Sequence, residues 1–149
     1  MIRLNELSPN ELSSLRYLKN LFYVRRNSLN NKVISINEHK MWFNINKNKL
    51  IIYTIQSNNR IIGYIRYDKI NNQNYYLNYM LIREFHGKRI MKQSIISSFK
   101  KLKIKQNHNF LFLNAITLLV NIKSTRLLKK LDFRLIETKD SHLLFRKKI

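Results

Sequence analysis

Cysteine is absent from this chain of 149 residues, and glycine (2), proline (1) and acidic residues (8) are scarce. The lack of cysteine excludes disulfides, thiolate nucleophiles and thiolate-bound metals. No apolar run is long enough to span a membrane. The N-terminus, MIRLNELSPNELSS, contains acidic residues and lacks the apolar stretch of a secretory signal. Because this length holds one hydrophobic core but not two, we expect a single cytoplasmic domain with no membrane partner.

Positive charge is abundant: 29 basic residues give a formal net charge of +21. Such a charge favours nucleic acid as a partner. The chain is also rich in lysine, asparagine and isoleucine, a bias that AT-rich codons produce. The basic residues are spread from Arg3 to Lys148 rather than gathered in a tail or stripe. We therefore do not expect nucleic-acid binding to be the main function, and we expect the charge to favour small acidic ligands.

Capping and turn residues divide the chain into helices and strands. Ser8–Glu11 and Ser35–Glu38 have the spacing of capping boxes, and Ser57–Arg60 is typical of a hairpin turn. We expect an α/β (α+β) domain with a mixed, mostly antiparallel central sheet flanked by helices. The expected helices begin at Ser8, Ser35, Gly87 (to about Lys103) and Ser124 (to Leu131), and the expected strands are Leu50–Ile55, Ile61–Tyr67, Tyr75–Ile82, Phe110–Ile116, Phe133–Glu137 and Leu143–Arg146.

The stretch from Arg83 to Gln93, REFHGKRIMKQ, connects an alternating strand to a long amphipathic helix. The first N–H groups of a helix have no intrahelical partners, and the helix dipole adds positive charge there. Lys88, Arg89 and Lys92 add full charges at the same place. This arrangement predicts a phosphate-bearing ligand. A solvated surface loop with lysines has the same local pattern and is the alternative.

Two motifs on the expected elements carry a resemblance to a known family. Glu84–Gln93 reads EFHGKRIMKQ after a strand and before a helix, and Asn121–Ser124 is followed by the lysine-rich turn Lys130–Phe133. These motifs and the element order resemble the GNAT-fold N-acetyltransferases. The resemblance implies a GNAT-like domain over residues 1–149, with acetyl-CoA as co-substrate in a splay between neighbouring strands.

The same resemblance assigns the residues that would bind acetyl-CoA. The family usually has a small residue at positions 89 and 91, where this chain has Arg89 and Met91. Positive φ at Arg89 would cost on the order of 1 kcal/mol. We expect helical dihedrals instead, which would leave its guanidinium free to pair with a phosphate. The implied cofactor-binding residues are Leu81 and Ile82, whose backbone N–H groups would polarise the thioester carbonyl, then His86, Gly87, Lys88, Arg89, Ile90 and Met91, and finally Asn121 and Ser124.

The N-terminal half narrows the resemblance. Arg26–Ser28, Ser35–Phe43 and Gly63–Arg66 look like the branch that acetylates nucleotide-linked amino sugars, as in the pseudaminic acid pathway. This implies that the acceptor is a primary amine of such a sugar. Arg26 and Arg66 have the chemistry to hold a diphosphate, and Trp42 could stack on a ring. Solvated charge and core packing are the alternative roles.

Attack of an amine on a thioester requires a base for the amine. We expect this base to be Glu38 or His39, on a short helix that the family places at the acceptor mouth. The alternatives are that Glu38 only completes its capping box and that His39 is a surface residue. Asn78 is a candidate to orient the acceptor amine or a water.

The departing thiolate is usually protonated by a tyrosine in this family. By alignment that position is Leu128, which has no proton to give. Tyr79 and Tyr76, on the expected central strand, are candidate substitutes. Loss of the acid would slow the reaction rather than prevent it.

Two other functions stay open at this point. A protein or peptide N-acetyltransferase of the same fold would need an open acceptor groove. A degenerate module that binds CoA or nucleic acid without catalysis is suggested by Arg89, Met91 and Leu128. His108 and His142 have no ligand spacing, so no metal is expected. Either a monomer or a homodimer is compatible with the sequence.

Overall fold

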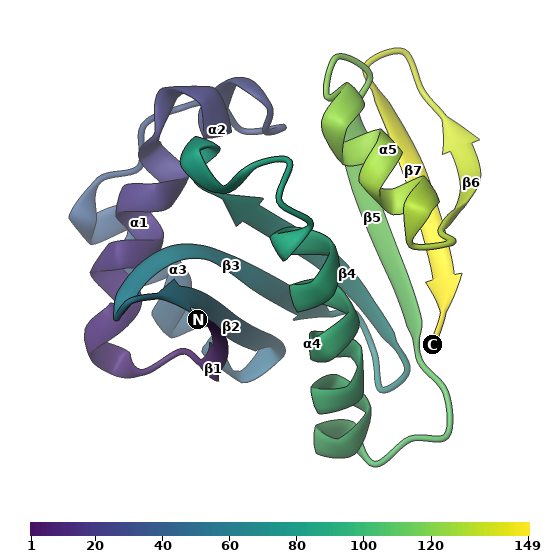
Figure 1. The fold of residues 1–149 in the computed structure, drawn as a ribbon, viewed down its shortest axis with the longest axis horizontal. Coiled ribbons are helices and arrows are strands. Elements are labelled where there is room, and N and C mark those ends of the chain that lie inside the picture. The colour runs from purple at the N-terminus through teal and green to yellow at the C-terminus, as the bar shows by residue number, and fades with distance from the viewer.

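One seven-stranded sheet forms the centre of the computed structural model, which describes residues 1–149 (Figure 1). The strand order is β1-β2-β3-β4-β5-β7-β6, and every neighbouring pair is antiparallel except β4 and β5. The strands are β1 (Ile2–Glu6), β2 (Leu50–Ser57), β3 (Arg60–Lys69), β4 (Asn74–Leu81), β5 (Phe112–Leu118), β6 (Arg134–Thr138) and β7 (His142–Lys148). The helices are α1 (Leu12–Asn20), α2 (Phe22–Arg26), α3 (Ile36–Asn46), α4 (Ile90–Gln106) and α5 (Ile122–Lys130), with 3-10 turns at Pro9–Glu11, Lys47–Lys49 and Arg83–Phe85.

The predicted helix start at Ser35 and the hairpin at Ser57–Arg60 are confirmed, whereas α5 begins at Ile122, two residues before the predicted Ser124. At α3 the Ser35 hydroxyl accepts a hydrogen bond from the Glu38 N–H, and the Glu38 carboxylate accepts one from the Ser35 N–H at 2.7 Å. Asn58 and Asn59 both have positive φ, as a tight hairpin turn between β2 and β3 requires. None of the helices is both long and apolar enough to cross a membrane.

Three other local features differ from the expectation. β1 was not predicted, because its residues are mostly exposed and show no buried alternation; backbone pairing with β2 forms it. After the helix that begins near Ser8 no second helix was expected before Ser35, but α2 forms at Phe22–Arg26. α4 begins at Ile90 rather than at Gly87, because Gly87 and Arg89 both have left-handed backbone conformations.

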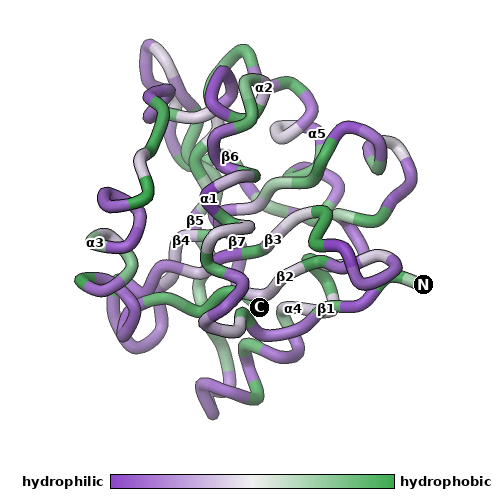
Figure 2. Tube along the Cα trace, turned by 90° about the vertical axis from the view of Figure 1, so that its left-hand side faces the viewer, coloured by the Kyte–Doolittle hydropathy of each residue, from purple (hydrophilic) through white to green (hydrophobic).

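The helices cover the two faces of the sheet, α3 on one face and α4 with α5 on the other (Figures 1 and 2). Side chains on the α4 face are large and buried. Tyr67 contacts the Ser98 hydroxyl at 2.5 Å, and Tyr75 donates to Gln106 at 2.7 Å, which fixes α4 on the sheet. The core around them consists of buried aliphatic and aromatic residues.

The sheet opens between its two parallel strands. β4 and β5 pair only over Asn74–Tyr76 and Phe112–Asn114, and they diverge beyond that point. In Figure 1 the gap separates a part of the sheet covered by α4 from a part covered by α5. This is the splay that the resemblance predicted, and it leaves the last residues of β4 without a strand on one side.

Candidate active site at the splayed strands

A cleft of about 270 Å³ lies at the divergence of β4 and β5. Tyr79 and Ser124 line it from the α5 face, whereas Lys19 and Asp68 line it from the α1 face. The cleft therefore crosses the plane of the sheet, so two ligands entering from opposite faces can meet in it. Its lining residues are Lys19, Val24, Asn27, Ser28, Leu29, Asn30, Tyr64, Asp68, Tyr76, Leu77, Asn78, Tyr79, Met80, Ala115, Ile116, Thr117, Leu118, Asn121 and Ser124.

Backbone N–H groups of β4 face the opening. The Ile82 N–H donates to the carbonyl of Ile62 in the neighbouring strand β3 at 2.9 Å. Since successive residues of a strand point in opposite directions, the N–H groups of Tyr79 and Leu81 point toward the side from which β5 has diverged. They are suited to stabilise an oxyanion. The expectation that Ile82 shares this role is wrong, because its N–H is used within the sheet.

The loop between β4 and α4 has the backbone that the phosphate cradle requires. Gly87 has a φ of +76°, and a Cβ placed there would meet nothing within 4 Å, so the space beside it is open. Arg89, the residue before α4, has φ 61° and ψ 2°. The expectation of helical dihedrals at Arg89 is therefore wrong: the turn into α4 needs a left-handed residue there, at a cost on the order of 1 kcal/mol.

The other residues of this loop divide between solvent and core. Lys88 is exposed, with its Nζ 5.3 Å from the centre of the Phe85 ring. Met91 is buried in the core, so its bulk lies away from the loop. Because α4 begins at Ile90, the N–H groups of its first turn have no intrahelical partner. A large residue at position 91 is thus compatible with an open cradle.

His86 ties the loop to the end of β4. Its Nε2 lies 2.7 Å from the Leu81 carbonyl oxygen, and the edge of the Tyr23 ring packs against it with 6.5 Å between ring centres. We expected His86 to bind the cofactor; its observed contacts are with the Leu81 carbonyl and the Tyr23 ring. It therefore shapes the loop and the strand end.

Tyr79 reaches from β4 to the start of α5. Its hydroxyl lies 2.5 Å from the Ser124 hydroxyl, and the Asn121 side chain caps the helix by accepting from the Ser124 N–H at 3.3 Å. Burial raises the pKa of Tyr79 to about 12, so its phenol is protonated at neutral pH. Leu128 is fully buried in the core. The cleft thus contains a protonated phenol, and it projects from β4.

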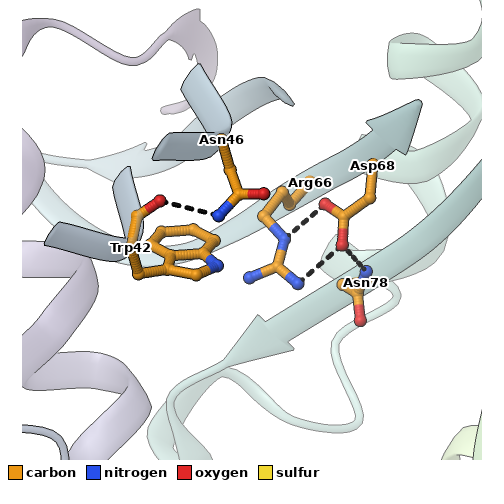
Figure 3. Close-up of polar contacts among 5 residues, drawn as sticks. All are labelled: Trp42, Asn46, Arg66, Asp68 and Asn78. Atoms are coloured by element: carbon orange, nitrogen blue, oxygen red, sulfur yellow. Dashed lines mark hydrogen bonds and ion pairs between the residues drawn. The ribbon is translucent and has the colours of Figure 1, made fainter. Parts of the chain in front are cut away.

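On the opposite face, Arg66 is held between an aromatic ring and a carboxylate (Figure 3). Its guanidinium lies 5.0 Å from the Trp42 ring centre and donates to Asp68 at 2.7 and 2.8 Å. Asn78 donates to the same carboxylate at 3.2 Å. The side-chain amide of Asn46 donates to the backbone carbonyl of Trp42 at 2.8 Å. Arg66 and Trp42, predicted to hold a nucleotide, are thus engaged with each other and with Asp68.

The sequence analysis overlooked Asp68 and Lys19, both of which line the cleft. Asp68 lies two residues after Arg66 on one strand, so both side chains project from the same face. That spacing was a usable signal. Lys19 lies one position after the buried Leu18 in α1, and no local pattern distinguishes it from a solvated lysine.

The two predicted bases, Glu38 and His39, lie outside the cleft lining. Glu38 is fully exposed. The hydrogen bond that its carboxylate accepts from the Ser35 backbone N–H lowers its pKa. His39 is buried and stacked on Trp42 with 5.3 Å between ring centres. Burial and the nearby Arg16 and Arg66 lower the pKa of His39, so it is neutral at pH 7.

The predicted substrate-binding residues Arg26, Trp42 and Arg66 also lie outside the lining. Arg26 is exposed in the last turn of α2. Its neighbour Arg25 is the one that contacts the following segment, donating to the carbonyls of Asn20 and Asn31. The structure therefore brings Asn78, Tyr79 and Ser124 together, but not Glu38, His39 or Arg26.

Comparisons with known proteins agree with this geometry. The chain matches the model of the acetyltransferase (GNAT) domain over residues 2–134. No curated protein matches it significantly. Among solved structures it is similar to a domain from Methanocaldococcus jannaschii DSM 2661, with 18% identity over 100% of this chain and 99% of that chain and a TM-score of 0.85.

Two further solved structures have similar folds. RimL, a ribosomal L7/L12 alpha-N-protein acetyltransferase in complex with coenzyme A, is 18% identical over 99% of this chain and 94% of that chain, with a TM-score of 0.80. Spermidine N-acetyltransferase from Vibrio cholerae, in complex with CoA and spermine, is 16% identical over the same shares, also with a TM-score of 0.80. At these identities the similarity concerns the fold.

Proposed function

Because the chain belongs to the acetyltransferase (GNAT) family, we propose that it transfers the acetyl group of acetyl-CoA to a primary amine in the cleft between β4 and β5. The observation that carries this proposal is the continuity of the cleft through the sheet. Its α5 face offers the Tyr79 phenol and unpaired strand N–H groups, and its other face offers polar side chains.

The loop before α4 is suited to the diphosphate of acetyl-CoA. The open space beside Gly87 leaves room for phosphate oxygens next to the backbone, and the N-terminus of α4 provides N–H donors. Lys88, Arg89 and Lys92 add positive charge at this end. The Leu81 N–H, which points into the opening, would polarise the thioester carbonyl.

Proton transfer in the cleft can be assigned to one side chain and to water. Tyr79 would donate to the departing thiolate, because its phenol is protonated over the whole neutral range. Asp68 is the only carboxylate that lines the cleft, and Asn78 donates to it. Because Arg66 occupies both oxygens of Asp68, we assign Asn78 to orient the acceptor amine and water in the cleft to take up its proton.

We propose that the acceptor is the amino group of a nucleotide-linked amino sugar. The similarity of the N-terminal half to that branch supports it. A peptide N-terminus is the alternative. However, the segment from Asn27 to Asn30 lines the α1 face of the cleft, which we call the acceptor side, and this favours a small molecule. Arg66 is paired with Asp68 and Arg26 is remote, so another group must receive the phosphates of such an acceptor.

Release of free CoA tests the proposal. The protein should release CoA from acetyl-CoA in step with the loss of a primary amine, and mass spectrometry should find the acetylated amine. The panel comprises a nucleotide-linked amino sugar, glucosamine, spermidine and a peptide with a free N-terminus. A Gly87→Glu variant serves as the donor-site control. Absence of amine-dependent CoA release with the whole panel would contradict the proposal.

A further inference from the structure

Lys19 is the cation of the acceptor side of the cleft. It projects from α1 and lines the cleft together with Asp68 and Asn78. Its ammonium donates to the Ser28 hydroxyl at 3.1 Å, and that hydroxyl donates to the Val24 carbonyl at 2.7 Å. An ammonium has three N–H donors, and only one of them has a protein partner here.

No carboxylate compensates the charge of Lys19. The one acidic residue in the lining, Asp68, is occupied by both nitrogens of the Arg66 fork and by Asn78. Lys19 forms no ion pair, although it is half-buried. Burial and the nearby Arg66 lower the pKa of Lys19, and no carboxylate offsets these two effects. The acceptor side therefore has an uncompensated positive charge.

The segment beside Lys19 is held in place from both ends. Arg25 donates to the carbonyls of Asn20 and Asn31 at 3.1 and 3.0 Å, which fixes the turn that follows α2. Asn30 lines the cleft in this turn, and its side-chain oxygen accepts from the Lys32 N–H. The amide N–H groups of Asn30 have no protein partner, so they provide further donors on the same side as Lys19.

From this arrangement we infer that Lys19 binds an anionic group of the acceptor, so that the enzyme acetylates primary amines that also carry a phosphate or a carboxylate. The inference rests on the proposed function and specifies its acceptor class. Lys19 takes the role that the sequence analysis gave to Arg26 and Arg66. Polycations are disfavoured, because they would bring positive charge next to Lys19 and Arg66 without a free carboxylate to receive it.

Matched acceptors test this inference by turnover. Glucosamine 1-phosphate and glucosamine present the same amine with and without a phosphate, and alanine and alaninamide do so for a carboxylate. We expect kcat/KM to be about tenfold to a hundredfold higher for the anionic member of the pair that fits the cleft, as for one charge-assisted hydrogen bond. The pair that shows the preference identifies the anion. Equal kcat/KM within both pairs would overturn the inference while leaving the proposed function intact.

A substitution then assigns the preference to Lys19. Lys19→Met should remove it by raising KM for the anionic acceptor, with KM for acetyl-CoA unchanged, and Lys19→Arg should retain most of it. Lys101→Met, an exposed lysine of α4, is the matched control and should change neither value. A preference that persists in Lys19→Met would overturn the assignment.

Binding separates this inference from the proposed function. Calorimetric titration of glucosamine 1-phosphate into the protein saturated with CoA needs no turnover. We expect binding that Lys19→Met weakens about tenfold or more and that Lys101→Met leaves unchanged. If this is observed but no amine is acetylated, the anion site stands and the proposed function fails. If the phosphorylated sugar binds no better than glucosamine, the inference fails.

Discussion

The hydroxyl of Tyr79 on β4 lies 2.5 Å from that of Ser124 on α5, and this contact spans the gap between the two parts of the sheet. The bond holds a protonated phenol beside the strand N–H groups that face the opening. In this family a tyrosine on the helix usually supplies the acid, and here Leu128 occupies that position. The contact supports our proposal that Tyr79 donates the proton to the departing thiolate in place of such a tyrosine.

Replacing Tyr79 with phenylalanine should lower kcat about a hundredfold, the lower end of the range for removal of a general acid. KM for acetyl-CoA should change little, because the ring remains. Steady-state kinetics with Tyr76→Phe as the matched control measures this. Tyr76 also lines the cleft but forms no hydrogen bond to α5. An equal loss in both variants would contradict the assignment of Tyr79.

Substitution of Gly87 by glutamate should abolish acetyl-CoA binding, because it puts a carboxylate beside the phosphates. Gly87→Ala is the control for backbone strain, since any side chain at a φ of +76° is strained whereas only glutamate adds charge. Calorimetry should show a much weaker affinity for Gly87→Glu than for Gly87→Ala. Unchanged affinity in Gly87→Glu would place the phosphates elsewhere.

Arg89→Gly should stabilise the protein by about 0.5–1 kcal/mol, because it removes the cost of a left-handed side-chain residue before α4. Lys88→Gly is the matched control, because Lys88 directly precedes Arg89 in the same exposed loop and does not have positive φ. Denaturant unfolding should show the gain for Arg89→Gly only. Equal destabilisation in both variants would mean that the conformation of Arg89 carries no strain.

Two buried tyrosines should respond in opposite ways to loss of their hydroxyl groups. The Tyr53 hydroxyl is buried without a hydrogen-bond partner, whereas that of Tyr67 contacts Ser98. Tyr53→Phe should leave stability unchanged or raise it, and Tyr67→Phe should lower it by about 1 kcal/mol. The two free energies of unfolding, compared by chemical denaturation, test this. A marked loss in Tyr53→Phe would reveal a partner for its hydroxyl.

Alkaline pH should destabilise the fold through Tyr53 and Tyr79. Burial raises the pKa of each to about 12, against about 10 in the unfolded chain. Between these values the unfolded chain loses the proton that the folded one keeps, so the free energy of unfolding falls as pH rises. Unfolding curves from pH 9 to 11 measure the slope, which should be shallower in Tyr53→Phe. Identical slopes would contradict the raised pKa of Tyr53.

Local chemistry was sufficient to predict most of the elements. The capping box at Ser35 and the asparagines of the hairpin determine their own backbone conformation, so their neighbours in sequence reveal them. β1 could not be predicted in this way, because a strand with little buried surface depends on its pairing with β2.

The site was less accessible to sequence than the fold. The motif around Gly87 locates the loop, but the left-handed conformation of Arg89 depends on how the chain enters α4. The pairing of Arg66 with Asp68 depends on the direction in which two side chains turn on one strand face. Lys19 becomes notable only when the packing of α1 shows that no carboxylate reaches it.

Calorimetric titration with acetyl-CoA at low and high salt tests the central claim most directly, with ATP as the competing phosphate ligand. The account predicts saturable one-to-one binding that ATP displaces poorly and that salt weakens only modestly. Weak binding that ATP matches and that salt abolishes would contradict it, since a chain of net charge +21 would then be binding phosphate only as a polycation.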